Sequence, residues 1–388
     1  MTLRKVAVIG AGSTSYGKFT MTARDLALLA SKEAIERAEV EPKDIQGAFI
    51  ANAFGLAEKQ GHLGPLIMSG LGIPDVPAST IESACSSGAS AFREAYINIA
   101  AGIYDVMLVV GTERISHLDT ITSTTYFSFG SDYLFEGACG ASFPGLYAAM
   151  AKSHMDRFGT TEEHLALVAV KNHENGMLNE KAHLQKGISV DDVLKSPSIA
   201  YPLKLYDSCP FSDGAAAVIL ASEEYMSKRA NSDGYTLIRG SGRAGGNGAL
   251  HSRDDMTSLR STILASRDAL KQAGISISDI DFAEVHDCFT IAELIAMEDL
   301  GITGRGQAAA AVEQNRTRLD GDIPINPSGG LKAKGHPIGA TGVGQVVEVF
   351  EQLNNNAGRR QVKDAKIALT HNLGATGGSS AVHIFSRE

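Results

Sequence analysis

The residues best suited to chemistry in this sequence are cysteines and histidines at the ends of predicted strands. Cys85 follows several small residues and leads directly into an amphipathic segment, 89–101, that is predicted to be a helix. A thiol at a helix N-terminus faces unpaired amides and the positive end of the helix dipole, and both favour the thiolate. Cys85 is therefore a candidate nucleophile. The alternative is that it is a small buried residue, as most free cysteines are.

Three polar clusters in the second half of the chain also follow predicted strands. The first contains His286, Asp287 and Cys288, the second Lys334 and His336, and the third His371, Asn372 and Gly374. Because the carboxyl ends of strands hold the sites of open α/β folds, we expect these clusters to meet. One histidine at such a position is more often structural, but cysteines and histidines at three equivalent strand ends favour a catalytic site.

This set of side chains could perform a Claisen condensation of two acyl thioesters. Cys85 would carry the first acyl group, and neutral His336 would take the proton of its thiol. Cys288 would remove a proton from the carbon beside the second thioester carbonyl. The side chains of His286 and His336 would stabilise the enolate oxygen. The backbone amides of Cys85 and Gly374 would stabilise the acyl oxygen, and such donors are each worth about 3 kcal/mol.

The elements that must position these groups alternate between strands and helices. Apolar runs predict strands at 6–9, 47–51, 106–110, 215–220, 281–285 and 366–370, and helical spacing predicts helices at 22–38, 89–101, 145–158, 161–173 and 340–353. This alternation is typical of an α/β protein. Gly10 and Gly12 follow the first strand, but their spacing differs from a dinucleotide fingerprint, so a nicotinamide site is disfavoured.

Three stretches depart from the alternation. Residues 116–150 are rich in Thr, Ser, Phe, Tyr and Gly, and we expect a long excursion over the core that acts as a lid or an oligomer contact. Residues 240–253 are rich in glycine and are predicted to be loop-like. The polar segment 227–234 is predicted to link two halves of the chain.

The chain contains an internal repeat. Residues 29–54 and 264–289 align without a gap and share nine identities in 26 positions. A shorter match places Cys85 and the four residues after it over His336 and the four after it, each followed by a predicted helix and strand. The alternative for the shorter match is coincidence between small residues. Duplicated halves related by a pseudo-twofold axis would place Cys85 and His336 at matching helix N-termini.

Composition narrows the class of protein. A chain of 388 residues exceeds one ordinary core, so we expect two halves, 1–230 with a lid and loop region at about 116–210, and 231–388. The net charge of −9 without a basic stripe argues against nucleic acid, and no apolar run approaches the ~20 residues that span a bilayer. The four cysteines have no zinc spacing, so we expect reduced thiols, no metal and a cytoplasmic location, with Cys139 and Cys209 structural.

These motifs resemble the thiolase superfamily. The resemblance rests on Cys85 in its small-residue turn, on Gly335-His336-Pro337, on Asp213-Gly214-Ala215-Ala216 and on the closing glycine loop, and it covers essentially the whole chain. The closest branch carries His-Asp-Cys-Phe, here residues 286–289, as do sterol-carrier-protein-type and archaeal-type acetoacetyl-CoA thiolases. The resemblance implies the thiolase fold, in which two duplicated α/β halves form a layered αβαβα arrangement with a lid.

One departure from the family pattern is informative. Degradative and classical biosynthetic thiolases carry a second cysteine in the final loop, where this chain has Asn372. The resemblance implies that Cys288 takes over the missing acid/base role and that Asn372 and Gly374 lie at the substrate. It also places Ser266 where thiolases have a pantetheine-binding serine. That assignment is weakened because Ser266 recurs as Ser31 in the repeat.

The resemblance implies an acetyl-CoA C-acetyltransferase that reversibly condenses two acetyl-CoA into acetoacetyl-CoA and CoA through an acetyl-Cys85 intermediate, without a cofactor. It further implies a homodimer or a dimer of dimers, supply of mevalonate and isoprenoid synthesis, and partnership with HMG-CoA synthase and a small zinc-ribbon/OB-fold acyl-CoA-binding scaffold. Two alternatives are a 3-ketoacyl-CoA thiolase for longer chains and a non-catalytic thiolase-fold protein that binds acyl-CoA or lipid. The complete set of Cys85, Cys288 and His336 counts against the second.

Overall fold

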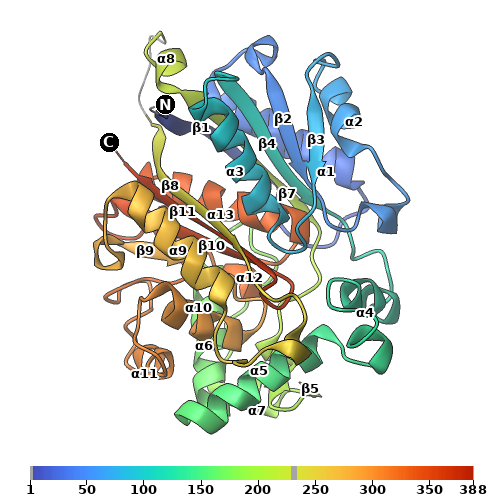
Figure 1. Cartoon of the computed structure of the whole chain (residues 1–388), viewed down its shortest axis with the longest axis vertical. Helices are drawn as coiled ribbons and strands as arrows, with labels where there is room; N and C mark the ends of the chain where they lie inside the picture. The colour runs from blue at the N-terminus through green and yellow to red at the C-terminus, as the bar shows by residue number, and fades with distance from the viewer. Residues whose placement is uncertain (1–2, 229–233, 388) are drawn as a thin grey trace.

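A mixed sheet of nine strands forms the centre of the molecule (Figure 1). The structure, a computed structural model, describes residues 3–228 and 234–387. In spatial order the strands are β3 (Ala78–Ile81), β2 (Gly47–Ala51), β4 (Val106–Glu113), β7 (Gly214–Ser222), β1 (Val6–Ser13), β8 (Thr236–Gly245), β11 (Ser379–Ser386), β10 (Ile367–Gly374) and β9 (Phe282–Glu284). β1 and β8 join the two halves by antiparallel pairing of Ala7 with Leu237 and of Val8 with Thr236.

The order of strands outward from this junction is the same in both halves. β1, β7, β4 and β2 on one side correspond to β8, β11, β10 and β9 on the other. The predicted repeat has the same basis: α1 (Ala23–Ala38), η1 (Pro42–Asp44) and β2 match α9 (Arg260–Ala273), η6 (Ile277–Asp279) and β9. The duplication expected from the sequence is therefore confirmed. The predicted boundary at residue 230 lies outside the described residues, as does most of the predicted link at 227–234.

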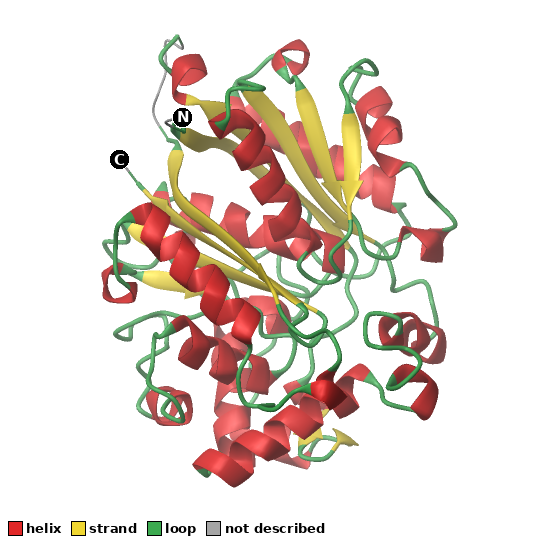
Figure 2. Ribbon diagram, viewed as in Figure 1, coloured by secondary structure: helices red, strands yellow, loops and turns green. Residues whose placement is uncertain are grey.

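Helices divide the strands into layers (Figure 2). α1 and α2 (Leu63–Gly70) cover the outer face of the N-terminal strands, and α9 with α10 (Thr290–Leu300) covers the outer face of the C-terminal strands. α3 (Ser87–Ala100) and α13 (Ile338–Leu353) lie between the two halves, where both helices pack against strands of the N-terminal half and against each other. The result is the expected αβαβα arrangement. Strands covered on both faces must be apolar on both faces, which explains their continuous hydrophobic runs.

Paired glycines allow the outer helices to approach the sheet. A Cβ at Gly10 would collide with the carbonyl of Ala34 in α1, and a Cβ at Gly242 would collide with the carbonyl of Ala265 in α9. The Gly10-x-Gly12 motif is thus a helix-packing feature inside β1. The loop predicted at 240–253 is wrong over its first part, because β8 continues to Gly245. Its glycines reflect close helix packing and not a turn.

The excursion expected after β4 is present and occupies most of the lid and loop region expected at about 116–210. It contains α4 (Thr120–Ser128), α5 (Phe143–Phe158), α6 (Glu162–Gly176), α7 (Val190–Lys195), β5 (Ser198–Ala200) and β6 (Leu203–Lys204). α5, α6, α7 and β5 lie at the lower end of the view in Figure 1, and α4 lies to the right. The shorter helices α11 (Ala308–Glu313) and α12 (Gly330–Ala333) pack against α6. α8 (Glu223–Met226) follows β7. Within the described residues, no helix combines the length and apolar character needed to cross a membrane.

Candidate active site

The predicted nucleophile and its partners converge where the N-termini of α3 and α13 meet the loop after β9. The sulfur of Cys85 and a ring nitrogen each of His286 and His336 lie within 4.8 Å of one another. Cys85, Cys288 and His336 line one cavity of about 380 Å³. The juxtaposition on which the sequence hypothesis depends is therefore present in the structure.

The turn that carries Cys85 is held in a conformation unusual for a residue with a side chain. Ala84 has a φ of +49°, in the left-handed region, which turns the chain sharply just before the nucleophile. The hydroxyls of Ser83, Ser86 and Ser379 lie within 3.1 Å of one another below this turn. These bonds tie the Cys85 turn to β11, so both halves of the chain position the sulfur.

The N-termini of α3 and α13 touch because glycine faces glycine. A Cβ at Gly88 would lie 2.8 Å from the amide nitrogen of Val343 and 2.9 Å from that of Gly342. α3 begins at Ser87, so Cys85 lies just before the helix and not in its first turn. This close approach brings Cys85 and His336 to the same pocket, as the duplicated motif predicts.

The resting state of Cys85 differs from the expectation. Burial raises the pKa of the Cys85 thiol to about 12, and the opposing effect of the Ala375 and Cys85 amides is smaller. The helix end was expected to favour the thiolate, but desolvation in a closed cavity outweighs it. The free thiol is therefore protonated and needs a base beside it.

His336 has the tautomer that such a base requires. Its Nδ1 lies 2.6 Å from the hydroxyl of Thr341, which in turn donates to the carbonyl of Pro337 at 3.0 Å. Because Thr341 donates its hydroxyl proton to the carbonyl of Pro337, its oxygen accepts from Nδ1–H of His336. The available lone pair of the His336 ring is therefore on Nε2. Nε2 has no partner within the described structure, and burial lowers the pKa of His336 to about 3. A neutral acceptor thus faces the Cys85 thiol.

His286 has the opposite arrangement. The side-chain amide of Asn372 donates to its Nδ1 at 3.0 Å, so the proton of this neutral ring is on Nε2. Burial and the neighbouring His336 and His371 hold the pKa of His286 well below its ordinary value. Its Nε2, buried and unpartnered among the described atoms, is therefore a free N–H donor. One histidine accepts and the other donates, with their ring centroids 5.0 Å apart.

Cys288 lies on the lid side of the cavity. Burial raises the pKa of its thiol well above the ordinary value, with Cys209 and Cys85 adding to the effect. The lid segment runs alongside both catalytic loops, because Cys209 donates its amide to the carbonyl of Cys288 at 3.0 Å and Phe211 pairs with His336. Cys209 was expected to be structural, and it also lines the cavity.

The two remaining predicted substrate residues are not at the cavity surface. Gly374 is packed beneath the Cys85 turn against Ser379, and the next residue, Ala375, supplies the amide nearest the Cys85 sulfur. Ser266 is buried in α9 and is not among the described residues that line the cavity. Its counterpart Ser31 is buried in α1 in the same way, which favours packing over substrate contact. His371 is bonded to Thr262 in the core.

Several functional neighbours were not found from the sequence. Glu113, buried at the end of β4, accepts from the amides of Ala53, Phe54 and Gly339 and so holds the N-terminus of α13; burial raises its pKa to about 7. Tyr147 reaches the cavity from the lid. Glu113 could have been found from the sequence, because a carboxylate at the end of an apolar strand is unusual enough to suggest a functional role. Nothing in the sequence distinguishes Tyr147 from other lid aromatics.

The cavity wall that the lid forms is largely apolar. It includes Phe127, Phe143, Tyr147, Leu205 and Phe211, and Phe289 also lines the cavity. Water is poorly held against such a surface, so charge that develops near Cys85 meets fixed protein donors in a medium of low polarity.

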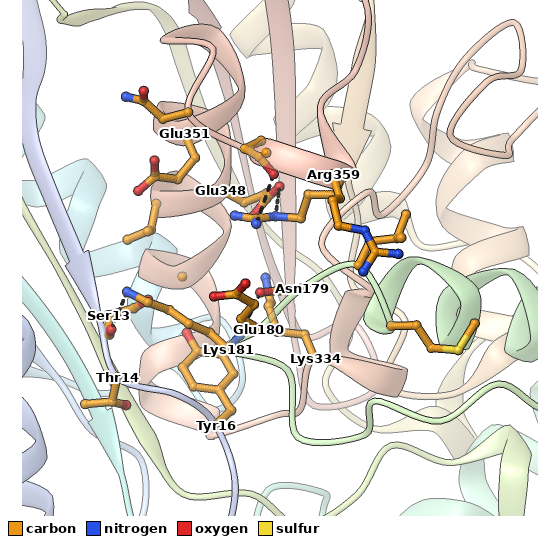
Figure 3. Close-up of a pocket in the computed structure, with 18 of the residues that line it drawn as sticks. Ser13, Thr14, Tyr16, Asn179, Glu180, Lys181, Lys334, Glu348, Glu351 and Arg359 are labelled. Atoms are coloured by element: carbon orange, nitrogen blue, oxygen red, sulfur yellow. Dashed lines mark hydrogen bonds and ion pairs between the residues drawn. The ribbon is translucent and has the colours of Figure 1, made fainter.

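A second cavity of about 380 Å³ lies behind the His336 loop (Figure 3). It is polar, and two pairs of its charged side chains are bonded: Arg360 pairs with Glu348, and Lys181 bonds to Glu33 and also to the carbonyl of Ser13. Lys334, two residues before His336, pairs with Glu284, two residues before His286, at 3.4 Å. This buried ion pair ties together the loops that carry the two histidines.

The atoms of Cys85, His286 and His336 are also close enough to consider a metal ion. The donor set argues against one as the resident group. Asn372 leaves Nε2 of His286 protonated, whereas a metal ligand needs a lone pair there. The chemistry of the site is that of a thiol, a neutral base and a neutral donor.

A layered α/β fold with a buried thiol, its base and a second thiol in one apolar cavity defines a class of enzymes that transfer acyl groups through cysteine. The comparisons narrow this class: the family model "Thiolase, N-terminal domain" matches residues 6–224, and "Thiolase C-terminal domain-like" matches residues 242–387. The chain belongs to the thiolase family.

Two relatives agree with this family, and one solved structure shares the fold. The chain is 44% identical to an acetyl-CoA acetyltransferase of Methanothermobacter thermautotrophicus over 99% of this chain and 100% of that one. It is 32% identical to human sterol carrier protein 2 over 99% of this chain and 72% of that protein. A solved structure, the Ltp2-ChsH2(DUF35) aldolase, superposes with a TM-score of 0.86 at 22% identity, covering 100% of this chain and 98% of that one.

Proposed function

We propose that the protein is an acetyl-CoA C-acetyltransferase that condenses two acetyl-CoA into acetoacetyl-CoA and CoA through an acetyl group on Cys85. The observation that carries the proposal is the meeting of a buried thiol, an accepting histidine and a donating histidine within 4.8 Å, beside a second thiol. The relative that is 44% identical over its full length is an acetyl-CoA acetyltransferase, which supports the same substrate.

In the first half-reaction His336 and Cys85 act together. Nε2 of His336 takes the thiol proton, and the sulfur of Cys85 attacks the carbonyl carbon of acetyl-CoA. The amides of Cys85 and Ala375 donate to the oxygen that becomes negative. The bond from carbon to the CoA sulfur then breaks, and the CoA thiolate takes the proton of Cys288. Acetyl-Cys85, a Cys288 thiolate and protonated His336 remain.

In the second half-reaction Cys288 is the base. Its thiolate removes a proton from the methyl carbon of a second acetyl-CoA, and the electron pair moves to the thioester oxygen. Nε2–H of His286 donates to that oxygen. The carbon attacks the acetyl group, the bond to Cys85 breaks, and the sulfur recovers its proton from His336. Each proton returns to its origin, so the cycle needs no cofactor beyond its CoA thioester substrates.

A second candidate function is a 3-ketoacyl-CoA thiolase for longer acyl chains. The observation in its favour is the aromatic wall of the 380 Å³ cavity, which offers apolar surface beyond what an acetyl group covers. A non-catalytic acyl-CoA or lipid carrier is disfavoured, because a carrier has no use for two histidines with opposite tautomers at a thiol.

The wider setting is part of the same proposal. We place the enzyme in the cytoplasm, where its four free cysteines would stay reduced, and at the entry to mevalonate and isoprenoid synthesis. β3 is an edge strand next to the Cys85 turn, which suits pairing between copies in a homodimer or a dimer of dimers. HMG-CoA synthase and a zinc-ribbon/OB-fold scaffold are proposed partners; the solved structure of similar fold is the Ltp2-ChsH2(DUF35) aldolase.

The test of the proposed function is a product profile with purified protein. Acetyl-CoA should give acetoacetyl-CoA, and thiolysis of 3-ketoacyl-CoA substrates should be fastest with four carbons. Faster thiolysis of longer chains would favour the second candidate. Binding of acyl-CoA without any product would reject both enzymatic functions.

A further inference from the structure

Tyr147 of the lid helix α5 connects the two sulfur sites. We propose that Tyr147 is a positioning residue for proton transfer, whose hydroxyl alternates between the carbonyl of Ala375 and the thiolate of Cys288 and so makes the condensation base available. This inference rests on the proposed function, because it assigns Tyr147 a role in the second half-reaction.

The side chain is held rigidly at both ends. It is fully buried, its hydroxyl donates to the carbonyl of Ala375 at 2.8 Å, and its ring stacks on Phe289 with 4.6 Å between centroids and 28° between planes. Phe289 directly follows Cys288 in the chain, so the stack fixes the hydroxyl at the level of the thiol. Tyr147 and Cys288 line the same cavity, and the Tyr147 hydroxyl lowers the pKa of the Cys288 thiol against the larger effect of burial.

The carbonyl that accepts from Tyr147 belongs to a residue that also serves Cys85. Ala375 has a φ of +53°, and in this left-handed conformation its amide interacts with the Cys85 sulfur while its carbonyl faces Tyr147. The hydroxyl of Tyr147 therefore lies between the peptide of the acylation site and the thiol of the condensation site.

A single hydroxyl proton has two possible acceptors here. A thiol is a weak acceptor, so while Cys288 is protonated the hydroxyl donates to Ala375. A thiolate is charged and accepts a much stronger hydrogen bond, so the hydroxyl turns toward Cys288 once its proton has left. Rotation about the C–O bond redirects the hydroxyl proton from the carbonyl of Ala375 toward Cys288.

The surroundings of Cys288 favour such a donor. Burial, Cys209, Cys85 and Asp287 all disfavour its thiolate, while Tyr147 favours it. In the free enzyme His286 and His336 are neutral and add no positive charge. After acylation His336 holds the proton of Cys85 and adds a positive charge, and the Tyr147 hydroxyl adds a hydrogen bond that stabilises the Cys288 thiolate before it removes a proton from carbon.

The experiment compares Tyr147→Phe with Phe143→Leu, a change one turn earlier on the same helix that alters the cavity wall without touching a hydroxyl. Deuterium uptake into the methyl group of acetyl-CoA in heavy water measures the proton removed by Cys288, and mass spectrometry of quenched enzyme measures acetylation of Cys85. Tyr147→Phe should slow deuterium uptake about 10- to 100-fold, since a hydrogen bond to a charged group is lost. Acetylation should be retained, and the pH at which uptake is half-maximal should rise.

The outcomes separate this inference from the proposed function. Wild-type enzyme that neither acetylates Cys85 nor exchanges deuterium would reject the function itself. If wild type does both, the inference is overturned when Tyr147→Phe exchanges at the wild-type rate. It is also overturned when this variant slows acetylation and exchange equally with an unchanged pH midpoint, as Phe143→Leu should. Should Tyr147→Phe fail to fold, 3-fluorotyrosine incorporation, which makes phenols stronger donors, should lower the pH midpoint, and no shift would count against the role.

Discussion

Replacing Thr341 with valine tests the assignment of His336 as the base for Cys85. Thr341 is buried at the first turn of α13, and its hydroxyl accepts Nδ1–H of His336 at 2.6 Å while donating to Pro337. Valine has nearly the same shape but no oxygen. Nδ1–H would then be buried without an acceptor, which costs about 1–3 kcal/mol. The ring escapes this cost by moving its proton to Nε2, where it can no longer accept from the Cys85 thiol.

A preference of about 2 kcal/mol for the wrong tautomer leaves roughly one molecule in thirty with a free Nε2 lone pair. We therefore expect Thr341→Val to form acetyl-Cys85 roughly 30-fold more slowly. Quenched-flow mixing with acetyl-CoA followed by mass spectrometry measures this rate before turnover. Deuterium exchange measured on enzyme that is already acetylated should change much less, because that step depends on Cys288 and His286.

Thr341→Ser is the matched control, since it keeps the hydroxyl and removes one methyl group. It should acetylate at close to the wild-type rate. Two results would refute the reasoning: a Thr341→Val enzyme that acetylates as fast as wild type, or a Thr341→Ser enzyme that is slowed as much as Thr341→Val. The first would show that the tautomer of His336 does not matter, and the second that packing at the helix turn matters instead.

Three further changes test other parts of the account. Cys288→Ala should still be acetylated on Cys85 but should lose condensation and deuterium exchange; normal turnover would remove Cys288 from the mechanism. Gly88→Ala should destabilise the fold by about 2 kcal/mol, because its Cβ would lie 2.8 Å from the amide of Val343, whereas Gly248→Ala, with open space around it, should not. Burial lowers the pKa of His383 to about 3, so this buried histidine makes the free energy of unfolding fall as pH drops below about 6.5. His383→Phe should reduce that loss by about 1.4 kcal/mol per pH unit, measured by urea unfolding. An unchanged dependence of the free energy of unfolding on pH would contradict the burial argument.

The duplicated architecture could be predicted because it leaves a local signal. Helical spacing, apolar strands and the repeat at 29–54 and 264–289 depend on residues close in sequence, and they correctly imply that Cys85 and His336 occupy matching helix ends. The same kind of local signal gave a wrong prediction at 240–245. The glycines there predicted a loop, but they lie in β8 and allow helix α9 to pack closely against the strand.

The electrostatics of the site could not be predicted, because they depend on burial by distant segments. The protonated state of Cys85 follows from its enclosure by the lid and the C-terminal half, and not from the helix end beside it. The opposite tautomers of His286 and His336 depend on Asn372 and Thr341, and only the fold identifies those partners. Tyr147 is 141 positions from Cys288 in the chain and reaches it through the lid.

The central claim is that Cys85 carries the acyl group, with its proton taken by Nε2 of His336. The most direct measurement is peptide mapping by mass spectrometry after a rapid acid quench with acetyl-CoA, performed on wild type and Cys85→Ser. The account predicts one acetyl group per wild-type chain, located on the peptide that contains Cys85, and none in the variant. Acetyl on Cys288 or Cys209, or turnover in the absence of any acetylated peptide, would contradict it.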